Sequence, residues 1–98
     1  MPSSYATVRT ERPERYIKQL VSHLGHRLST DLADDGTGTV VMDGARCTLT
    51  PSDGSIHLAA SAGDDETLAR LEDVVGRHLV RFGAEGELEI AWAGSPAA

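Results

Sequence analysis

Apolar and polar positions follow two different periods along the chain, and each period indicates a different kind of element. From residue 13 to residue 29, apolar side chains recur at the three-to-four spacing of a helix face: Ile17, Leu20, Val21, Leu24 and Leu28. This spacing predicts a helix over residues 13–29 with one buried stripe. Pro13 suits its first turn, where an N–H group would have no partner inside the helix.

The next part of the chain has the two-residue alternation of strands. Three strands are predicted, over residues 39–42, 45–50 and 56–61. The pair Asp43-Gly44 separates the first two and suits a two-residue type I′ turn, in which both central residues have positive φ. This turn would place Met42 opposite Ala45.

The second connection is assigned to a longer turn over residues 51–54, which would place Leu49 opposite Ile56 and Thr48 opposite His57. In this register the apolar side chains of the three strands share one face, which supports the assignment. The members of that face are Val40, Met42, Ala45, Cys47, Leu49, Ile56, Leu58 and Ala60.

A second helix is predicted from Asp64-Asp65 to Gly83, because two carboxylates suit the first turn of a helix and glycine suits its end. Its buried stripe consists of Leu68, Leu71, Val75, Leu79 and Phe82. Two ion pairs at i,i+4 spacing are expected on its surface, Glu66 with Arg70 and Asp73 with Arg77. A last strand is predicted over residues 87–92.

These elements predict an α+β fold in the order α-β-β-β-α-β. Two helices cover one face of a four-stranded, mainly antiparallel sheet, and the other face is open to solvent or to a partner. We expect a single domain over residues 8–93, with flexible tails at residues 1–7 and 94–98. Six residues are expected to be nearly fully buried: Leu20, Leu24, Leu58, Leu71, Val75 and Ile90.

Composition and charge exclude several classes of protein. The net charge is −6, and an acidic surface repels phosphate backbones, so nucleic-acid binding is not expected. The chain has no apolar segment long enough to span a membrane. The single Cys47 rules out an internal disulfide, and it is predicted to be buried and inert. A cytoplasmic location is expected.

Three stretches of the sequence have the residues and spacing of a bacterial family. They are Arg15-Tyr16-Ile17-Lys18-Gln19-Leu20 leading to His23-Leu24-Gly25-His26-Arg27, then Leu71-Glu72-Asp73-Val74-Val75 with Arg77-His78-Leu79, and Arg81-Phe82 with Glu87-Leu88 and Trp92. From about Ala6 to Trp92 the chain therefore resembles the domain-of-unknown-function family numbered 2218. Arg27 stands where lysine is expected in this family, which keeps the charge and changes its geometry.

The resemblance implies an α+β fold and a bacterial source, with no assigned activity and no assigned cofactor. It also implies an association with flavin-dependent, siderophore-interacting ferric reductases, beside or fused to which such domains occur. On this basis we expect an accessory or ligand-binding module in iron and siderophore metabolism, which binds iron, haem or a siderophore complex or docks to such a reductase.

Histidines of the two helices are the candidate site residues. Helical wheels place His23 and His78 at the edges of the buried stripes, and Tyr16, His23 and Arg27 along one flank. If the helices pack side by side, Tyr16, His23, Arg27 and His78 line one groove for a small ligand. His23 and His26 are three residues apart and are candidate ligands for a metal ion such as Zn, Fe, Cu or Ni. The alternative is that these histidines are surface and boundary residues without a ligand.

The open sheet face is a second candidate. Arg46, Thr48 and His57 are predicted to lie there in adjacent pairs, where they would bind a small anion, an acidic partner or a second subunit. The alternative function is accordingly a structural interaction module that forms a homodimer through this face. An enzyme that uses a helix histidine as general base ranks last, because the sequence has no GxSxG, P-loop or HExxH motif.

Overall fold

Eight elements make up the part of the chain that the computed structural model describes, which is residues 2–82, 90 and 92–94. In chain order they are β1 Ser3–Arg9, α1 Pro13–Leu24, β2 Ser29–Leu32, β3 Gly38–Met42, β4 Ala45–Ser52, β5 Ser55–Ser61, α2 Asp65–Phe82 and β6 Ala93–Gly94. The order is therefore β-α-β-β-β-β-α-β, with strands β1 and β2 added to the predicted set.

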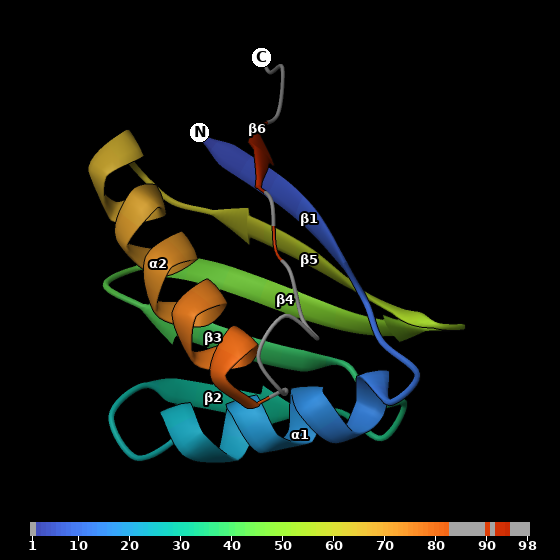
Figure 1. Cartoon of the computed structure of the whole chain (residues 1–98). Coiled ribbons are helices and arrows are strands. Elements are labelled where there is room, and N and C mark those ends of the chain that lie inside the picture. The colour runs from blue at the N-terminus through green and yellow to red at the C-terminus, as the bar shows by residue number, and fades with distance from the viewer. Residues whose placement is uncertain (1, 83–89, 91, 95–98) are drawn as a thin grey trace.

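The strands form one antiparallel sheet in the order β2-β3-β4-β5-β1-β6, in which β6 has only two residues. Both helices lie on the same side of this sheet (Figure 1), α1 over β2, β3 and β4 and α2 over β4 and β5. The predicted α+β architecture with two helices on one sheet face is confirmed. The sheet has six strands, whereas four were predicted.

The first hairpin has the predicted turn and register. Asp43 and Gly44 have φ values of 50° and 83°, and a type I′ turn requires positive φ at both positions. Met42 lies opposite Ala45 across the hairpin. The side chains of β3 and β4 that were predicted to face the helices therefore do so.

The second hairpin is shifted by two residues from its predicted register. Residues 53–54 form a two-residue turn, so Leu49 lies opposite Leu58 and Pro51 lies within β4. The pair next to the closing pair of such a hairpin exchanges no hydrogen bonds, and Pro51 therefore loses no bond to β5 by lacking an N–H group. A shift of two residues leaves every side chain on its predicted face.

The first residues of the chain form a strand, which corrects the prediction of a flexible tail over residues 1–7. β1 is hydrogen-bonded to β5 along its whole length. Its buried side chains are those of Ser4, Ala6 and Val8. Small inward residues produce only a faint hydrophobic alternation, which is why the sequence pattern did not indicate a strand. The domain extends to residue 3.

α1 begins at Pro13 as predicted but ends at Leu24 rather than at Ser29. The N–H groups of Arg27 and Leu28 both donate to the carbonyl oxygen of Leu24, which closes a turn directly after the helix. The chain then enters β2, which pairs with β3 at the edge of the sheet. The side chains of this edge strand are mostly exposed, so its sequence carries no alternation that predicts a strand.

Only some residues at the end of the chain are described, so the predictions made for this segment are tested only in part. Most of the strand predicted over residues 87–92 lies outside the described residues, and Ile90 and Trp92 are not in a strand. Both pack against the core while remaining partly exposed, so Ile90 is less buried than predicted. Of the tail predicted at residues 94–98, only Gly94 is described, in β6 beside β1.

The core lies between the sheet and the helices, and its packing is tightest where α1 crosses β3. The other five residues expected in the core are buried as predicted: Leu20, Leu24, Leu58, Leu71 and Val75. A Cβ atom at Gly38 would lie 2.7 Å from methyl carbons of both Ile17 and Val21, so only glycine lets the helix approach the strand this closely. Cys47 is also fully buried, and desolvation raises the pKa of its thiol to about 12. A thiol with this pKa stays protonated and unreactive.

Candidate functional site

Two histidines from different helices face each other above the sheet. His23 lies in the last turn of α1, and His78 lies toward the C-terminal end of α2. Their ring centroids are 5.1 Å apart, and the ring planes are inclined by 44°. The predicted juxtaposition of His23 and His78 is confirmed by this distance. Ligand binding by the two residues stays a prediction.

The ring of His78 is held by the backbone of its own helix. Its Nδ1 atom lies 2.6 Å from the carbonyl oxygen of Val74, one turn earlier. Because a carbonyl oxygen only accepts hydrogen bonds, Nδ1 is the donor, and the neutral ring has its lone pair on Nε2. The hydrogen bond thus fixes both the tautomer and the orientation of the ring, which is the role that backbone carbonyls have behind metal-binding histidines.

A groove of about 460 Å³ surrounds the two rings, and we call it the histidine groove. Its lining residues are His23, Leu24, His26, Arg27, Leu28, Met42, Val74 and His78. Half of them are apolar, the other half are histidines and an arginine, and none of these eight is acidic. They come from the end of α1, the turn that follows it, the end of β3 and α2. The groove therefore forms only when these segments pack together.

His26 and Arg27 reach the histidine groove from the turn that follows α1 and not from the helix itself. Both are exposed, and both line the groove. α1 ends at Leu24, so His26 lies outside the helix on which the pairing of His23 with His26 was based, and metal binding by the two stays a prediction. Among the described residues, no three histidine, cysteine or acidic side chains are grouped closely enough to hold a metal ion.

Tyr16 lies in the core and not in the histidine groove, which corrects the prediction for this residue. Its side chain is 6% exposed and packs within the main apolar cluster. Tyr16 precedes His23 by seven residues, which corresponds to about 10 Å along a helix axis. Two residues on one flank of a helix can therefore be too far apart to line the same groove.

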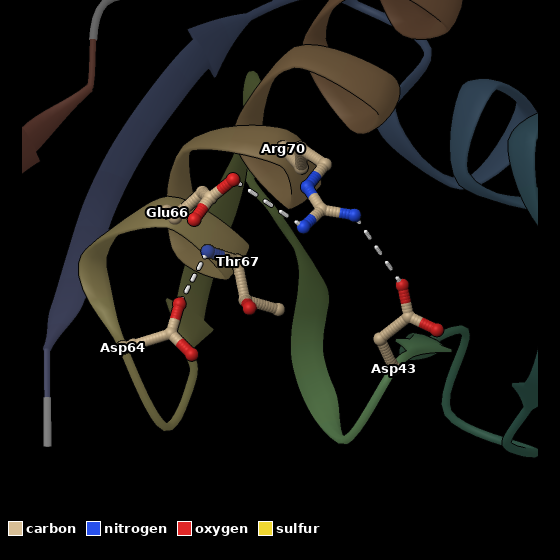
Figure 2. A network of polar contacts seen from close by, with 5 residues as sticks. All are labelled: Asp43, Asp64, Glu66, Thr67 and Arg70. Atoms are coloured by element: carbon tan, nitrogen blue, oxygen red, sulfur yellow. Dashed lines mark hydrogen bonds and ion pairs between the residues drawn. The ribbon is translucent and has the colours of Figure 1, made fainter.

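Met42 and Val74 are groove residues that the sequence reasoning did not identify. Met42 was assigned to the buried face of its strand, Val74 was given no role, and neither has a polar group that would have marked it. The next residue after Met42, Asp43, lies 3.9 Å from Arg70 of α2, as Figure 2 shows. Both side chains are more than half exposed, so this ion pair contributes little stability, but it links the hairpin end to α2 next to the groove.

The start of α2 has the predicted cap, which satisfies a backbone N–H group of the first turn. A carboxylate oxygen of Asp64 accepts a hydrogen bond from the backbone N–H of Thr67 at 2.7 Å (Figure 2). This hydrogen bond lowers the pKa of the Asp64 carboxyl below its ordinary value. Arg70 also lies 3.7 Å from Glu66, and Arg77 lies 3.1 Å from Asp73, so both predicted i,i+4 pairs are present.

The polar patch predicted on the open sheet face is divided in the structure. Thr48 lies opposite Ala59 and not opposite His57, because of the shifted hairpin register. His57 instead lies beside Thr7 of β1, with its Nδ1 atom 3.2 Å from the threonine hydroxyl oxygen. Arg46 lines a separate hollow of about 320 Å³ near β2. The three residues are on the predicted face but do not form one site.

A larger hollow of about 570 Å³ lies along a different side of α2, next to Ile90 and Trp92. It is a more open strip, it contains no histidine, and its charged residues carry both signs: Glu72, Asp73, Arg77 and Arg81. By volume alone, this hollow would be preferred over the histidine groove as the candidate binding site. The convergence of two imidazoles and a guanidinium on an apolar floor favours the histidine groove.

Comparison with protein families decides the classification of the chain. Residues 5–93 match a family described as "Uncharacterized protein conserved in bacteria (DUF2218)". The chain belongs to this family. The predicted resemblance to DUF2218 is therefore confirmed over nearly the whole sequence, and the family description assigns no function.

A solved relative has the same fold. The NMR structure of PA4090 from Pseudomonas aeruginosa is similar to this DUF2218 chain with a TM-score of 0.79 and 32% sequence identity, and the similarity covers 99% of this chain and 98% of PA4090. No curated protein matches the chain. Within the described residues, no helix of this DUF2218 protein is long and apolar enough to cross a membrane.

Proposed function

We propose that this DUF2218 protein is a ligand-binding accessory module and that the histidine groove is its binding site. The ligand is a small organic anion with an apolar body. The observation that carries the proposal is the convergence of His23, His78 and Arg27 on a floor formed by apolar side chains. Binding sites for small molecules typically combine a mostly apolar lining with a few polar groups that fix orientation.

The size and charge of the histidine groove support this class of ligand. A volume of about 460 Å³ lies within the range of about 300–1,000 Å³ that small-molecule sites have. The chain as a whole carries a net charge of −6, yet the eight lining residues include Arg27 and no acid. The groove is thus a local site for an anion on an acidic protein.

The narrower part of the proposal is the iron-related context. Its support is the resemblance that implies an association of such domains with siderophore-interacting reductases. In this context the ligand is an anionic siderophore or one of its chelating units, and a flavin-dependent, siderophore-interacting reductase is the expected partner. A catechol ring that carries a carboxylate combines an aromatic body with negative charge, so it matches the groove chemically.

The experiment uses 2,3-dihydroxybenzoate as the probe, because it combines an aromatic ring with a carboxylate. We expect NMR titration of the isotope-labelled protein to shift signals of Leu28, Met42 and His78. Arg27→Glu should weaken binding by about tenfold or more, since hydrogen bonds to charged groups are worth about 1.5–3 kcal/mol. Lys18→Glu is the matched control, because Lys18 is an exposed cation on α1 that does not line the groove.

Two results would overturn the proposal of this binding site. One is the absence of shifts at the groove, and the other is equal weakening by Arg27→Glu and Lys18→Glu. The iron-related context is tested by the ferric complex of the same acid. Tighter binding of the ferric complex than of the free acid supports this context. Equal or weaker binding removes it and leaves the ligand-binding proposal in place.

One observation favours a second candidate function, homodimer formation through the open sheet face. Tyr5 is 53% exposed on β1, and its strand partners are the small residues Ala59 and Ala93. A protruding aromatic ring surrounded by small side chains suits a protein interface. Sedimentation velocity over a range of concentrations tests this function. A dimer that Tyr5→Arg dissociates supports it, and a monomer at all concentrations excludes it.

A further inference from the structure

We infer that the histidine groove binds its ligand as a transition-metal chelate, in which His23 and His78 fill two adjacent coordination positions. The bound organic anion supplies the remaining ligands. This inference rests on the proposed function, because it needs a ligand in the groove, and it names the chemical class of that ligand. Its basis is the distance between the two rings together with the composition of the lining.

The ring separation matches two imidazoles that share one metal ion. With metal–nitrogen bonds of about 2.0–2.1 Å, ring centroids lie about 5.2 Å apart in tetrahedral geometry and about 4.5 Å apart in adjacent octahedral positions. The observed separation between His23 and His78 is 5.1 Å. Axial ligands on opposite sides of a haem iron would have centroids about 6.4 Å apart on the same bond lengths. The separation therefore allows adjacent positions on one ion and is too short for a haem held between the rings.

The surroundings of His78 suit a metal ligand. Nδ1 of His78 donates to the Val74 carbonyl, so Nε2 has the lone pair. A hydrogen bond of this kind orients a metal-binding ring and increases its basicity. His78 is partly buried between the helices, and the ring of His23 lies next to it from α1. Imidazole nitrogen suits nickel, copper, zinc and iron.

The lining indicates that the protein supplies only part of the coordination sphere. No group of three potential metal ligands occurs in the part of the chain that the structure describes. The eight described lining residues include no carboxylate, and Arg27 among them repels a bare cation and attracts an anionic chelator. Two ligands hold a free ion weakly, whereas a chelate brings its own oxygen or nitrogen donors. The apolar floor then contacts the organic part of the chelator.

The test compares bare Ni²⁺ with Ni²⁺–nitrilotriacetate, a chelate that leaves two adjacent coordination positions open. Untagged protein is titrated by calorimetry, and NMR line broadening by the paramagnetic ion locates the site. We expect one chelate per chain, bound more tightly than bare Ni²⁺, with broadening of the His23 and His78 signals. Loss of an outer-shell partner alone weakens metal sites by about 10–100-fold, so His23→Ala and His78→Ala should each weaken binding by at least about tenfold.

His57→Ala is the matched control and should leave binding of the chelate unchanged, whereas His26→Ala tests whether this groove residue takes the place of His78. His57 lies on the opposite face of the sheet and does not line the groove. His78→Gln keeps a polar side chain at this position, so it separates loss of the imidazole from loss of structure. Circular dichroism of each variant verifies that the fold is intact.

Three results would overturn the inference. The first is that Ni²⁺–nitrilotriacetate does not bind. The second is that the His23→Ala, His78→Ala double variant binds the chelate as tightly as wild type. The third is that binding of the chelate depends on His26 and not on His78. Binding of metal-free 2,3-dihydroxybenzoate then distinguishes failure of the metal inference from failure of the proposed function. If that acid still binds in the groove, only the metal inference fails. If neither probe binds there, the proposed function fails as well.

Discussion

Gly38→Ala is the most direct test of how α1 packs on the sheet. Gly38 begins β3 and lies under the middle of α1. A Cβ atom added at Gly38 would lie 2.7 Å from Cγ2 of Ile17 and 2.7 Å from Cγ2 of Val21. Carbon atoms in ordinary contact are about 3.5–4.0 Å apart, so the added methyl group must displace its neighbours.

Neither neighbour can move aside at low cost. Ile17 is fully buried, Val21 is nearly so, and one χ1 rotamer dominates for such β-branched side chains in a helix. α1 must therefore shift away from the sheet, and overpacking of this kind costs about 1–3 kcal/mol. In a domain of this size 1 kcal/mol corresponds to roughly 4–8 °C in Tm, so a loss of about 2 kcal/mol lowers Tm by roughly 8–16 °C.

Urea denaturation and thermal melting of wild type and Gly38→Ala measure this loss. Gly63→Ala is the matched control, because no atom lies within 4 Å of the added Cβ and the residue does not have positive φ. We expect this control to change the free energy of unfolding by less than about 0.5 kcal/mol. A loss of unfolding free energy that occurs in Gly38→Ala and not in Gly63→Ala is then due to the contact with α1.

A double-mutant cycle identifies the contact itself. Val21→Ala removes one of the two methyl groups that the new Cβ meets, so the combined variant should be more stable than additivity predicts, by roughly 0.5–3 kcal/mol. A Gly38→Ala variant that is as stable as wild type would refute the packing of α1 on β3. Strict additivity with Val21→Ala would show that the loss arises elsewhere.

Three further predictions concern α2 and the pH dependence of stability. Leu71→Ala should cost about 2–5 kcal/mol in urea denaturation, because the side chain is fully buried, and a smaller loss would mean that the helix face is misplaced. Gly76→Ala should instead raise the free energy of unfolding by about 0.5–1 kcal/mol. Its added Cβ would lie at ordinary contact distances from Ile90 and Trp92, so a loss of stability would indicate a closer approach. Hydrogen bonds from backbone N–H groups lower the pKa values of Asp35 and Asp64 in the folded chain. Their stabilising effect is complete above the unfolded pKa of about 3.9 and is lost as pH falls through the lowered values. Asp35→Asn with Asp64→Asn should therefore flatten the acid limb of the stability curve, and an unchanged limb would contradict this cause.

Strong periodicity was sufficient to predict the helices and the first hairpin, but it did not reveal the strands at the sheet edges. The stripe of α2 and the Asp43-Gly44 turn are local features, so the sequence contains all of their causes. β2 is an edge strand with exposed side chains, and β1 has small inward residues. Their formation depends on hydrogen bonds to β3 and β5, which a local pattern does not show.

The candidate site was predictable where it depends on helix faces and not where it depends on helix ends. His23 and His78 meet because each lies beside a buried stripe and the two helices contact each other. Tyr16 shares a flank with His23 but lies two turns away in the core. His26 reaches the groove from the turn after α1, because the helix ends earlier than its apolar spacing predicted. A helical wheel shows neither where a helix ends nor how far apart two residues lie along its axis.

The tight packing below α1 also determines how the histidine groove can bind a ligand. α1 lies on Gly38 with no room for a methyl group between them, and α2 is anchored by fully buried leucines and a valine. Neither helix can swing away without losing these contacts, so His23 and His78 are held close together before any ligand arrives. Residues that are already ordered lose little conformational freedom on binding, whereas isolated surface histidines would first have to be immobilised. The same rigidity restricts the ligand, because the groove can accept only a molecule that fits between walls already in place.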